Sequence, residues 1–495
     1  MSVRRALLVL PVVLLAAVAG IRASAQPQAQ IPTNLPSAAD WKRHLERDIL
    51  PFWETPAALG TPVGNFPTSR CNDGSVADPK ALCAEFAQAP DWIKSTVGRQ
   101  YLRMLSRQIY LYGVAFQLTG DEKYLTWARA GVRTLIAEAL GDKSKGVASY
   151  WEGGAAVADP ADQTSQDLSY VLVGLSFYYY LTRDPALLPP ILGIETYIKR
   201  TFYDPRAGLY RWKLKGPDAG KIELVAQLDQ ANAYMVLLAP LLPKPQQSLW
   251  RTELAQIART IRDRFYDPAS AMFFGELDPK PAANGCIYAR DDTDFGHTVK
   301  TYWMLYFIGR LLHDRDLAAF SRQRAAGIFA RAYLPATGSW ATQPTCNPPP
   351  RELDRTSMWW MAAELDQAAL TFGIADPGVL GYIPQTFDFW LKHMVDPRYG
   401  EVWDEVTTPE FTPRLPKVHL WKNGFHTAEH ALVGYIATGA IRGEPVELYY
   451  AFAGCRLPSD LRPYYYDGEV ASHAQTPLAE VPGLCRVKVT FARVR

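Results

Sequence analysis

Hydrophobic and polar positions along the chain predict paired helices. Apolar residues recur every three or four positions within long segments, which is the period of helices that bury one face. Three consecutive pairs of such segments have the ranges 99–118 with 124–140, 165–181 with 185–202, and 230–242 with 249–265. Each pair is therefore predicted to form a helical hairpin.

A turn of recurring composition separates these hairpins. It combines proline, glycine or aspartate with a closing aromatic residue, and the six examples end near Phe66, Trp151, Tyr210, Phe273, Trp340 and Trp403. After the first interval the turns return roughly every 60 to 70 residues, as expected of a two-helix repeat. The spacing predicts an all-α fold in which six hairpins close into an (α/α)6 barrel, with inner helices covered by outer ones.

Both ends of the chain differ from the barrel. Residues 1–25 combine two arginines, an apolar run and a small-residue cleavage site, so they are predicted to be a secretory signal peptide. Residues 26–37 are rich in proline and glutamine and are predicted to form a flexible linker. The barrel is assigned to residues 38–443, and residues 444–495, which alternate like a strand near their end, to a small C-terminal β extension or cap on the last hairpin.

Export predicts a periplasmic or secreted protein whose six cysteines form disulfides. Sequence proximity favours the pairs Cys71–Cys83, Cys286–Cys346 and Cys455–Cys485, although the sequence alone leaves the connectivity open. No stretch after the signal is long and apolar enough to span a membrane, so no membrane association is expected after cleavage.

Charge and aromatic content narrow the class of partner. The net charge is +2 and lysine and arginine are interspersed with acids, which argues against a nucleic-acid face or a polybasic membrane anchor. The chain has 14 tryptophans and 26 tyrosines, whose rings stack on sugars but also fill protein cores. A carbohydrate partner is compatible with this composition, and the sequence does not determine the oligomeric state.

Several polar residues on the predicted inner helices are candidates for chemistry. His297 heads a helix after a glycine, and Trp360 and Glu364 lie one turn apart, where they suit a sugar ring and its hydroxyls. Arg107 lies in a mostly apolar helix and needs a carboxylate or a ligand oxygen as partner. Each residue also has a plain structural interpretation as a buried, hydrogen-bonded core residue.

The stretch HLWKNGFHTAEHAL, residues 419–432, is the most unusual in the chain. His426 and His430 are spaced one helical turn apart, as a pair of metal ligands would be. Two histidines need a third ligand, however, and no cysteine pair has zinc-site spacing. The sequence therefore predicts neither a metal nor another cofactor, and His430 is expected to be structural.

These motifs, taken in order, resemble those of a known family. The segments HLERDILPFW, LSRQIYLYGVAF, GHTVKTYWML, WWMAAE and WKNGFHTAEHAL are similar to conserved segments of the N-acylglucosamine 2-epimerase / cellobiose 2-epimerase superfamily. The resemblance covers most of residues 38–465. It implies an (α/α)6 barrel that epimerises or isomerises reducing mono- or oligosaccharides at C2.

The resemblance also implies roles for individual residues. His297 and His426 would be the acid and base that move the C2 proton, and Arg107 would stabilise the enediolate oxygen. Trp360 and Trp421 would stack on the sugar. Glu364 would contact a hydroxyl.

Two positions depart from the pattern of the family. In NAYMVL, Asn232 is kept, whereas Tyr234 replaces a histidine and Leu237 a glutamate. Lys300 occupies the place of another glutamate, one turn after His297. An ammonium there disfavours a protonated histidine nearby, so the acid–base balance is expected to change. Asn232, Tyr234 and Lys300 are nevertheless expected to contact the sugar.

These departures keep two alternatives to a C2 epimerase or isomerase open. One is a glycoside hydrolase or lyase on the same barrel, for which Asp294 and Asp404 are the candidate carboxylate pair. The other is a carbohydrate-binding protein that has lost its catalytic activity.

Overall fold

Six inner helices form a closed ring in the computed structural model, which describes residues 30–140, 146–216, 218–277, 293–344 and 353–495. Each inner helix packs on its neighbours, and the last one, α17, packs on the first, α6, which closes the ring. The inner helices are α6 (Leu102–Thr119), α8 (Ser165–Thr182), α10 (Leu224–Gln230) with its continuation α11 (Val236–Leu238), α13 (Phe295–Leu312), α15 (Trp359–Gly373) and α17 (Phe425–Arg442). The predicted signal peptide and the pair Cys286–Cys346 lie outside the described residues.

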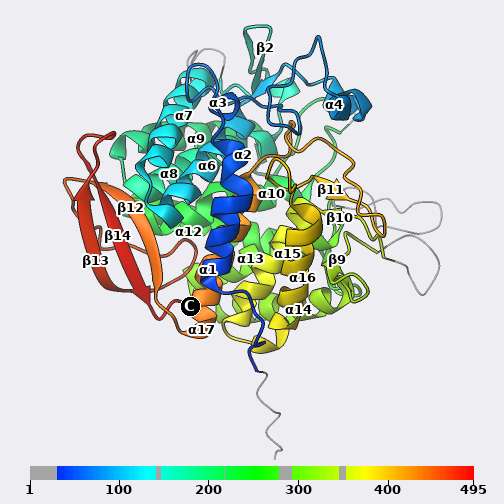
Figure 1. The fold of residues 1–495 in the computed structure, drawn as a ribbon, viewed down its shortest axis with the longest axis vertical. Coiled ribbons are helices and arrows are strands. Elements are labelled where there is room, and N and C mark those ends of the chain that lie inside the picture. The colour runs from blue at the N-terminus through cyan, green and yellow to red at the C-terminus, as the bar shows by residue number, and fades with distance from the viewer. Residues whose placement is uncertain (1–29, 141–145, 217, 278–292, 345–352) are drawn as a thin grey trace, which may run out of the picture.

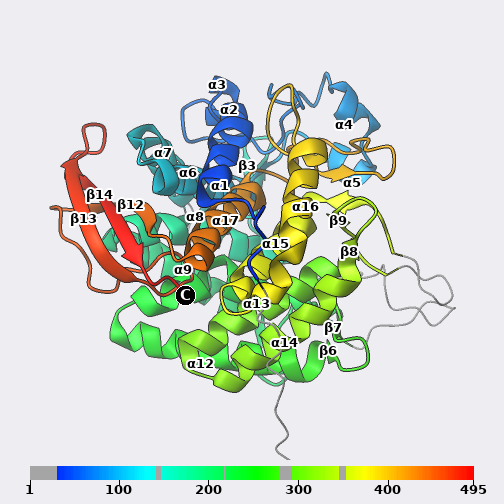
Figure 2. The ribbon, with the colours of Figure 1, turned by 60° about the horizontal axis from the view of Figure 1, so that its bottom comes forward.

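A second layer of helices surrounds this ring (Figures 1 and 2). The outer helices are α1 (Ala38–His44) with α2 (Leu50–Trp53), α7 (Glu122–Leu140), α9 (Leu188–Phe202), α12 (Lys244–Thr260), α14 (Arg315–Ala332) and α16 (Ile383–Phe389). Inner helices such as α8 are buried on nearly every face, whereas outer helices such as α7 bury one face only. That difference follows from sequence, because α8 is apolar all round and α7 is amphipathic. The predicted (α/α)6 barrel is confirmed.

The recurring aromatic turn is a short β-hairpin that returns the chain from an outer helix to the next inner one. Three examples are β4 (Tyr203–Asp204) with β5 (Leu209–Tyr210), β6 (Tyr266–Asp267) with β7 (Met272–Phe273), and β8 (Tyr333–Leu334) with β9 (Ser339–Trp340). Their aromatic residues are cross-strand partners, as in Tyr203 with Tyr210. The Asp204 side chain accepts hydrogen bonds from two backbone N–H groups of its turn, which explains the aspartate in the motif.

Loops and short elements cover the end of the barrel at which the inner helices α13, α15 and α17 begin. They comprise β1 (Gln100–Tyr101), β2 (Tyr150–Glu152), β3 (Ala155–Val157), β10 (Ser357–Met358), β11 (Glu405–Val406) and the short helices α3 (Pro56–Leu59), α4 (Ala84–Gln88) and α5 (Asp91–Lys94). The long first interval between turns contains the predicted Cys71–Cys83 disulfide, which is present.

The C-terminal extension is an antiparallel sheet of β12 (Val446–Ala453), β13 (Glu469–Pro477) and β14 (Leu484–Ala492), in the order β12-β14-β13. It lies to one side of the barrel in Figure 1 and carries the predicted Cys455–Cys485 disulfide. β12 contacts α17 of the last hairpin and also the inner helices α6 and α8. Between β12 and β13, three consecutive tyrosines, Tyr464 to Tyr466, are buried against the inner helices.

Helix α1 covers α17 through a contact that requires glycine. Gly434 of α17 lies directly against the buried indole of Trp41, and a Cβ atom at this position would overlap the ring. No helix within the described part of the chain is long and apolar enough to cross a membrane.

Gly434→Ala is expected to lower the free energy of unfolding by about 1–3 kcal/mol, because the added methyl group overpacks the α1–α17 contact. Thermal and urea unfolding followed by circular dichroism measure the change. Gly193→Ala is the control, since Gly193 in α9 has open space around its Cβ position. That substitution should stabilise the protein slightly through helix propensity. Equal effects of the two substitutions would contradict the packing constraint.

Candidate active site

A cavity of about 510 Å³ opens where α13, α15 and α17 begin. Six of the residues predicted from sequence line it, although they are spread over more than 300 positions, and they are Arg107, His297, Lys300, Trp360, Trp421 and His426. The ring of inner helices brings these side chains together, so the cavity is the candidate active site.

His297 lies in the first turn of α13 and is held by the residue that caps this helix. Asp294 accepts a hydrogen bond from the His297 backbone N–H at 2.6 Å, and its second oxygen lies 2.7 Å from Nδ1 of the ring. A carboxylate can only accept, so Nδ1 carries a proton in this contact. The negative charge of Asp294 also favours the protonated imidazole.

His426 lies in the first turn of α17 and has the opposite environment. Burial lowers the pKa of His426 well below its usual value, and the nearby charges of Arg107 and Lys300 lower it further. The ring of Trp360 contacts both histidines, with centroid distances of 4.5 Å to His297 and 6.3 Å to His426. His297 therefore lies beside a carboxylate and His426 among positive charges, although both line one aromatic-walled cavity.

Arg107 contributes a buried positive charge to the cavity wall. Its Nη1 donates to the backbone oxygen of Trp421 at 2.6 Å, and its guanidinium lies 3.9 Å from the ring centroid of Tyr170. Its Nε has no hydrogen-bond partner among the described residues. Burial lowers the pKa of Arg107, although the group stays a cation near neutral pH. The side chain is therefore fixed in place with hydrogen-bonding capacity left over.

Trp421 is positioned by a second arginine. The guanidinium of Arg103 lies 3.8 Å from the centroid of the Trp421 ring and donates twice to the backbone oxygen of Leu420. Arg103 is itself paired with Asp167 at 2.5 Å. These contacts fix the indole as a rigid wall of the cavity.

Lys300 is held in a buried ion pair that was not predicted. Its Nζ lies 3.0 Å from Asp229 Oδ1 and 3.0 Å from the Tyr170 hydroxyl. Burial alone would lower the pKa of Lys300, but Asp229 and Tyr170 raise it well above its usual value. A carboxylate in the apolar segment LVAQLDQANAY was the available signal for Asp229, because a buried acid needs a cation.

Tyr234 and Asn232 do not line the cavity, which corrects the prediction that they contact the sugar there. The Tyr234 hydroxyl donates to Gln230 at 2.7 Å, and its ring packs on Trp250 of the outer helix α12. Both residues lie in a π-helical turn over residues 231–235.

Glu364 is fully buried behind the cavity wall, so it does not offer the predicted contact to a sugar hydroxyl. Its Oε1 lies 3.5 Å from His426 Nδ1, and burial raises its pKa to about 8. Glu429 lies beside it, accepts a hydrogen bond from Tyr464 at 2.6 Å, and has a pKa that burial raises to about 7. Both carboxyl groups therefore lie close to His426 without lining the cavity.

Glu364, His426 and Glu429 could also serve as metal ligands, because their ligand atoms lie within 4.8 Å of one another. The raised pKa values of the two carboxyl groups and the positive charges of Arg107 and Lys300 both oppose a cation at this place. His430 is not part of the set. Its Nε2 lies 3.1 Å from Asp366, and its ring packs between Trp41 and Trp390, as expected of a structural residue.

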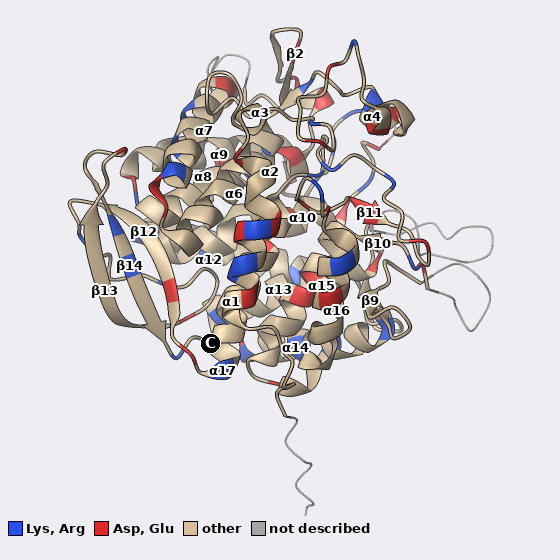
Figure 3. Ribbon diagram, in the orientation of Figure 1, with Lys and Arg blue, Asp and Glu red and all other residues tan. Residues whose placement is uncertain are grey.

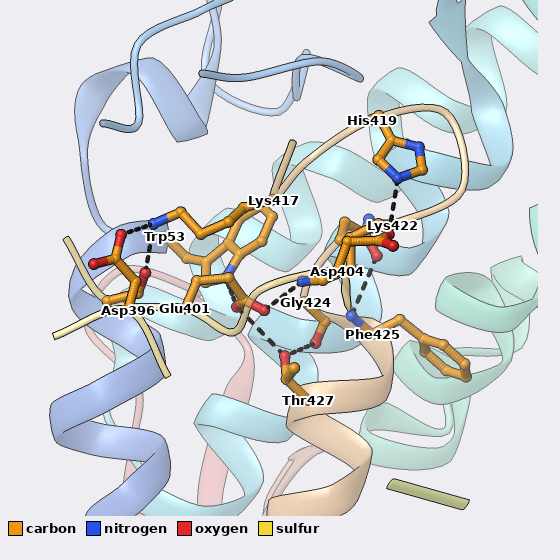
Figure 4. A network of polar contacts seen from close by, with 12 residues as sticks. Trp53, Asp396, Glu401, Asp404, Lys417, His419, Lys422, Gly424, Phe425 and Thr427 are labelled. Carbon is orange, nitrogen blue, oxygen red and sulfur yellow. Dashed lines mark hydrogen bonds and ion pairs between the residues drawn. The ribbon is translucent and has the colours of Figure 1, made fainter. Parts of the chain in front are cut away.

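A network of buried ion pairs anchors the loop that precedes α17 (Figure 4). Lys422 lies 2.9 Å from Glu401 Oε1, and the indole N–H of Trp53 donates to the other oxygen of Glu401 at 2.6 Å. His419 contacts Asp404 at 2.9 Å in the same region. Trp421 and His426 are thereby held at the cavity.

Asp294 and Asp404, the candidate carboxylate pair for glycoside hydrolysis, each form a hydrogen bond with a histidine. Asp294 is bound to His297 and Asp404 to His419, and neither lines the cavity. The two do not face a shared space in which a glycosidic bond would lie between them.

The barrel is that of known sugar epimerases. A D-mannose isomerase superposes with a TM-score of 0.66 at 16% identity, covering 82% of this chain and 98% of that one. Cellobiose 2-epimerase from Spirochaeta thermophila gives 0.65 at 20% identity, covering 82% and 97%. An α-1,6-mannanase from Salegentibacter sp. gives 0.52 at 13% identity, covering 81% and 100%. No protein-family model and no curated protein matches the chain. At these identities the likeness is one of fold.

Glu364→Gln is expected to change how stability depends on pH. The folded pKa of about 8 exceeds the usual 4.5, so the folded state binds the proton more tightly. The stabilisation from this group is complete below about pH 4.5 and is lost as the pH rises towards 8. The unfolding free energy of the parent relative to Glu364→Gln should therefore fall between pH 5 and 8, by on the order of 1 kcal/mol per pH unit.

Urea unfolding at several pH values measures this difference. Glu410→Gln is the control, because Glu410 is exposed and its replacement should give a difference that does not depend on pH in this range. A parallel pH dependence for the parent and Glu364→Gln would contradict a protonated Glu364.

Proposed function

We propose that this protein is an exported enzyme that interconverts reducing sugars at C2 by proton transfer. The observation that carries the proposal is the pair His297 and His426, which line one cavity in environments that favour opposite protonation states. An imidazole that is neutral and one that is protonated supply the base and the acid that such a reaction needs at once. The likeness of the barrel to sugar epimerases and an isomerase supports the same class of reaction.

In the proposed reaction, His426 removes the hydrogen at C2 of the open-chain aldose as a proton. The electron pair of the C2–H bond forms a C1–C2 double bond, and the carbonyl oxygen at C1 becomes the enediolate oxygen. Arg107 donates hydrogen bonds to this oxygen, where a preorganised positive charge is most effective. His297 then returns a proton to the opposite face of C2, which gives the epimer. Return of the proton to C1, with transfer of the O2 proton to O1, gives the ketose.

The aromatic walls of the cavity orient the sugar. Trp360 packs beside both histidines, and Trp421 is fixed on Arg103, so both offer rigid apolar surfaces to the C–H faces of a pyranose or an open chain. Lys300 is already paired with Asp229, so its ammonium group is not free to bind an acidic substrate. Its charge instead helps to keep His426 neutral. Neutral reducing mono- or oligosaccharides are therefore the proposed substrates.

Proton NMR of the protein with reducing sugars in D2O tests the reaction directly. The C2 hydrogen signal should disappear while an epimer or a ketose appears, and His297→Ala or His426→Ala should slow this by at least about a hundredfold. His473→Ala, an exposed position on β13, is the control and should keep full activity. If both active-site variants turn over as fast as the parent, the assignment is wrong. Tryptophan fluorescence quenching by sugars without any exchange would instead identify a binding protein.

Asp294→Asn tests the role of the helix cap. Asparagine also caps a helix, so α13 should be retained, but the charge that favours protonated His297 is lost. The protonated fraction then falls at a given pH, and the alkaline limb of the kcat/KM profile should move to lower pH.

Asp314→Asn is the matched control, because Asp314 caps α14 in the same way without a histidine partner. It should leave the limb in place. If the alkaline limb of the kcat/KM profile does not move in Asp294→Asn, His297 is not the acid.

A further inference from the structure

A second cavity of about 710 Å³ lies at the far end of the barrel. It is formed by the last turn of α13, the first turn of α14, part of α12 and the C-terminal extension. His297 and Arg310 mark the two ends of α13, and the helical rise places them about 20 Å apart. The cavity is therefore separate from the candidate active site.

Arginine dominates the lining of this second cavity. Arg251, Arg310, Arg315, Arg462 and Arg495 all contribute to it, with His313, whereas its acidic residues are Asp314 and Asp467. Elsewhere along the ribbon in Figure 3, by contrast, lysine and arginine are interspersed with acidic residues. Such an accumulation of one sign raises the local concentration of anions.

The two acids leave part of this charge uncompensated. Asp467 forms ion pairs with Arg310 at 2.5 Å and with Arg462 at 3.5 Å. The Asp314 side chain caps the N-terminus of α14. Within the described ranges, Arg251 and Arg315 form no ion pair. Their guanidinium groups therefore carry the charge that the protein itself does not neutralise.

Hydrogen bonds to the backbone fix one of the arginines in the wall of the cavity. Arg462 donates to the backbone oxygens of Tyr465 at 2.7 Å and Tyr466 at 3.3 Å, and burial lowers its pKa despite the nearby Asp467. The first turn of α14, a helix of 18 residues that Asp314 caps, lies at the same place. An arginine fixed by hydrogen bonds and two arginines without an ion pair among the described residues thus converge on one space.

We propose that this cavity binds a phosphate group, either as free phosphate or carried on a sugar. The planar guanidinium fork matches phosphate oxygens in a bidentate manner, and a doubly charged tetrahedral anion can meet several arginines at once. Neither the chemistry at C2 nor the first cavity requires such a site. The proposal is therefore independent of the proposed function.

Isothermal titration of the full-length protein with inorganic phosphate, at an ionic strength matched with KCl, tests the proposal. Phosphate should bind and raise the melting temperature, whereas KCl alone should do neither. The double variant Arg251→Gln/Arg315→Gln should bind at least about tenfold more weakly, because it loses both uncompensated charges. In KCl without phosphate the double variant should melt no lower than the parent, since two mutually repelling positive charges have been removed. Arg259→Gln, also on α12 but outside the cavity, is the matched control and should bind like the parent.

Asp467→Asn gives a test of opposite sign. Removing this carboxylate frees Arg310 and Arg462, so phosphate should bind more tightly than to the parent. A parallel titration with glucose 1-phosphate distinguishes the two sources, because tighter binding than inorganic phosphate indicates a phosphate carried on a sugar. Equal affinity in the parent and the double arginine variant, or no binding above the KCl background, would overturn the proposal.

Discussion

The buried ion pair between Lys422 and Glu401 is the constraint on which the rest of the candidate active site depends. Both side chains are fully buried, and removing two charges from water is costly unless further hydrogen bonds satisfy them. Trp53 supplies one such bond to Glu401. Glu401 adopts a left-handed backbone conformation, with φ of 63°, which a residue with a side chain accepts only where its surroundings impose it. The pair thus ties the N-terminal helices to the loop that carries Trp421 and leads into α17.

The two histidines acquire different chemistry because the residues around them differ. His297 has a carboxylate at hydrogen-bond distance, whereas His426 has Arg107, Lys300 and Lys422 in its surroundings and only a neutral carboxyl group behind it. Lys300, at the position where the family resemblance places a glutamate, therefore has a definite place in this arrangement. It forms an ion pair with Asp229 and contributes to the asymmetry between the histidines.

The inner helices also link the two ends of the molecule. At one end their first turns present the histidines to the cavity, and at the other their last turns meet the C-terminal extension. Tyr464 of that extension donates to Glu429, which lies beside Glu364 and His426, so the extension contacts the buried carboxyl groups next to His426. The arginine-lined cavity lies where the same extension meets α13 and α14. The extension is therefore part of the barrel's polar core as well as a cover.

The sequence by itself determined the helical hairpins, their number and the turns between them, because these depend on local periodicity and turn chemistry. It also identified two disulfides, whose partners are close in the chain, and six of the residues that line the cavity. Tertiary structure decided the rest. The packing of Tyr234 on Trp250 and the burial of Glu364 depend on how helices pack and leave no mark in the pattern of a single segment. Lys300 and Asp229 are 71 positions apart, so only the closed ring could reveal which buried charge neutralises which.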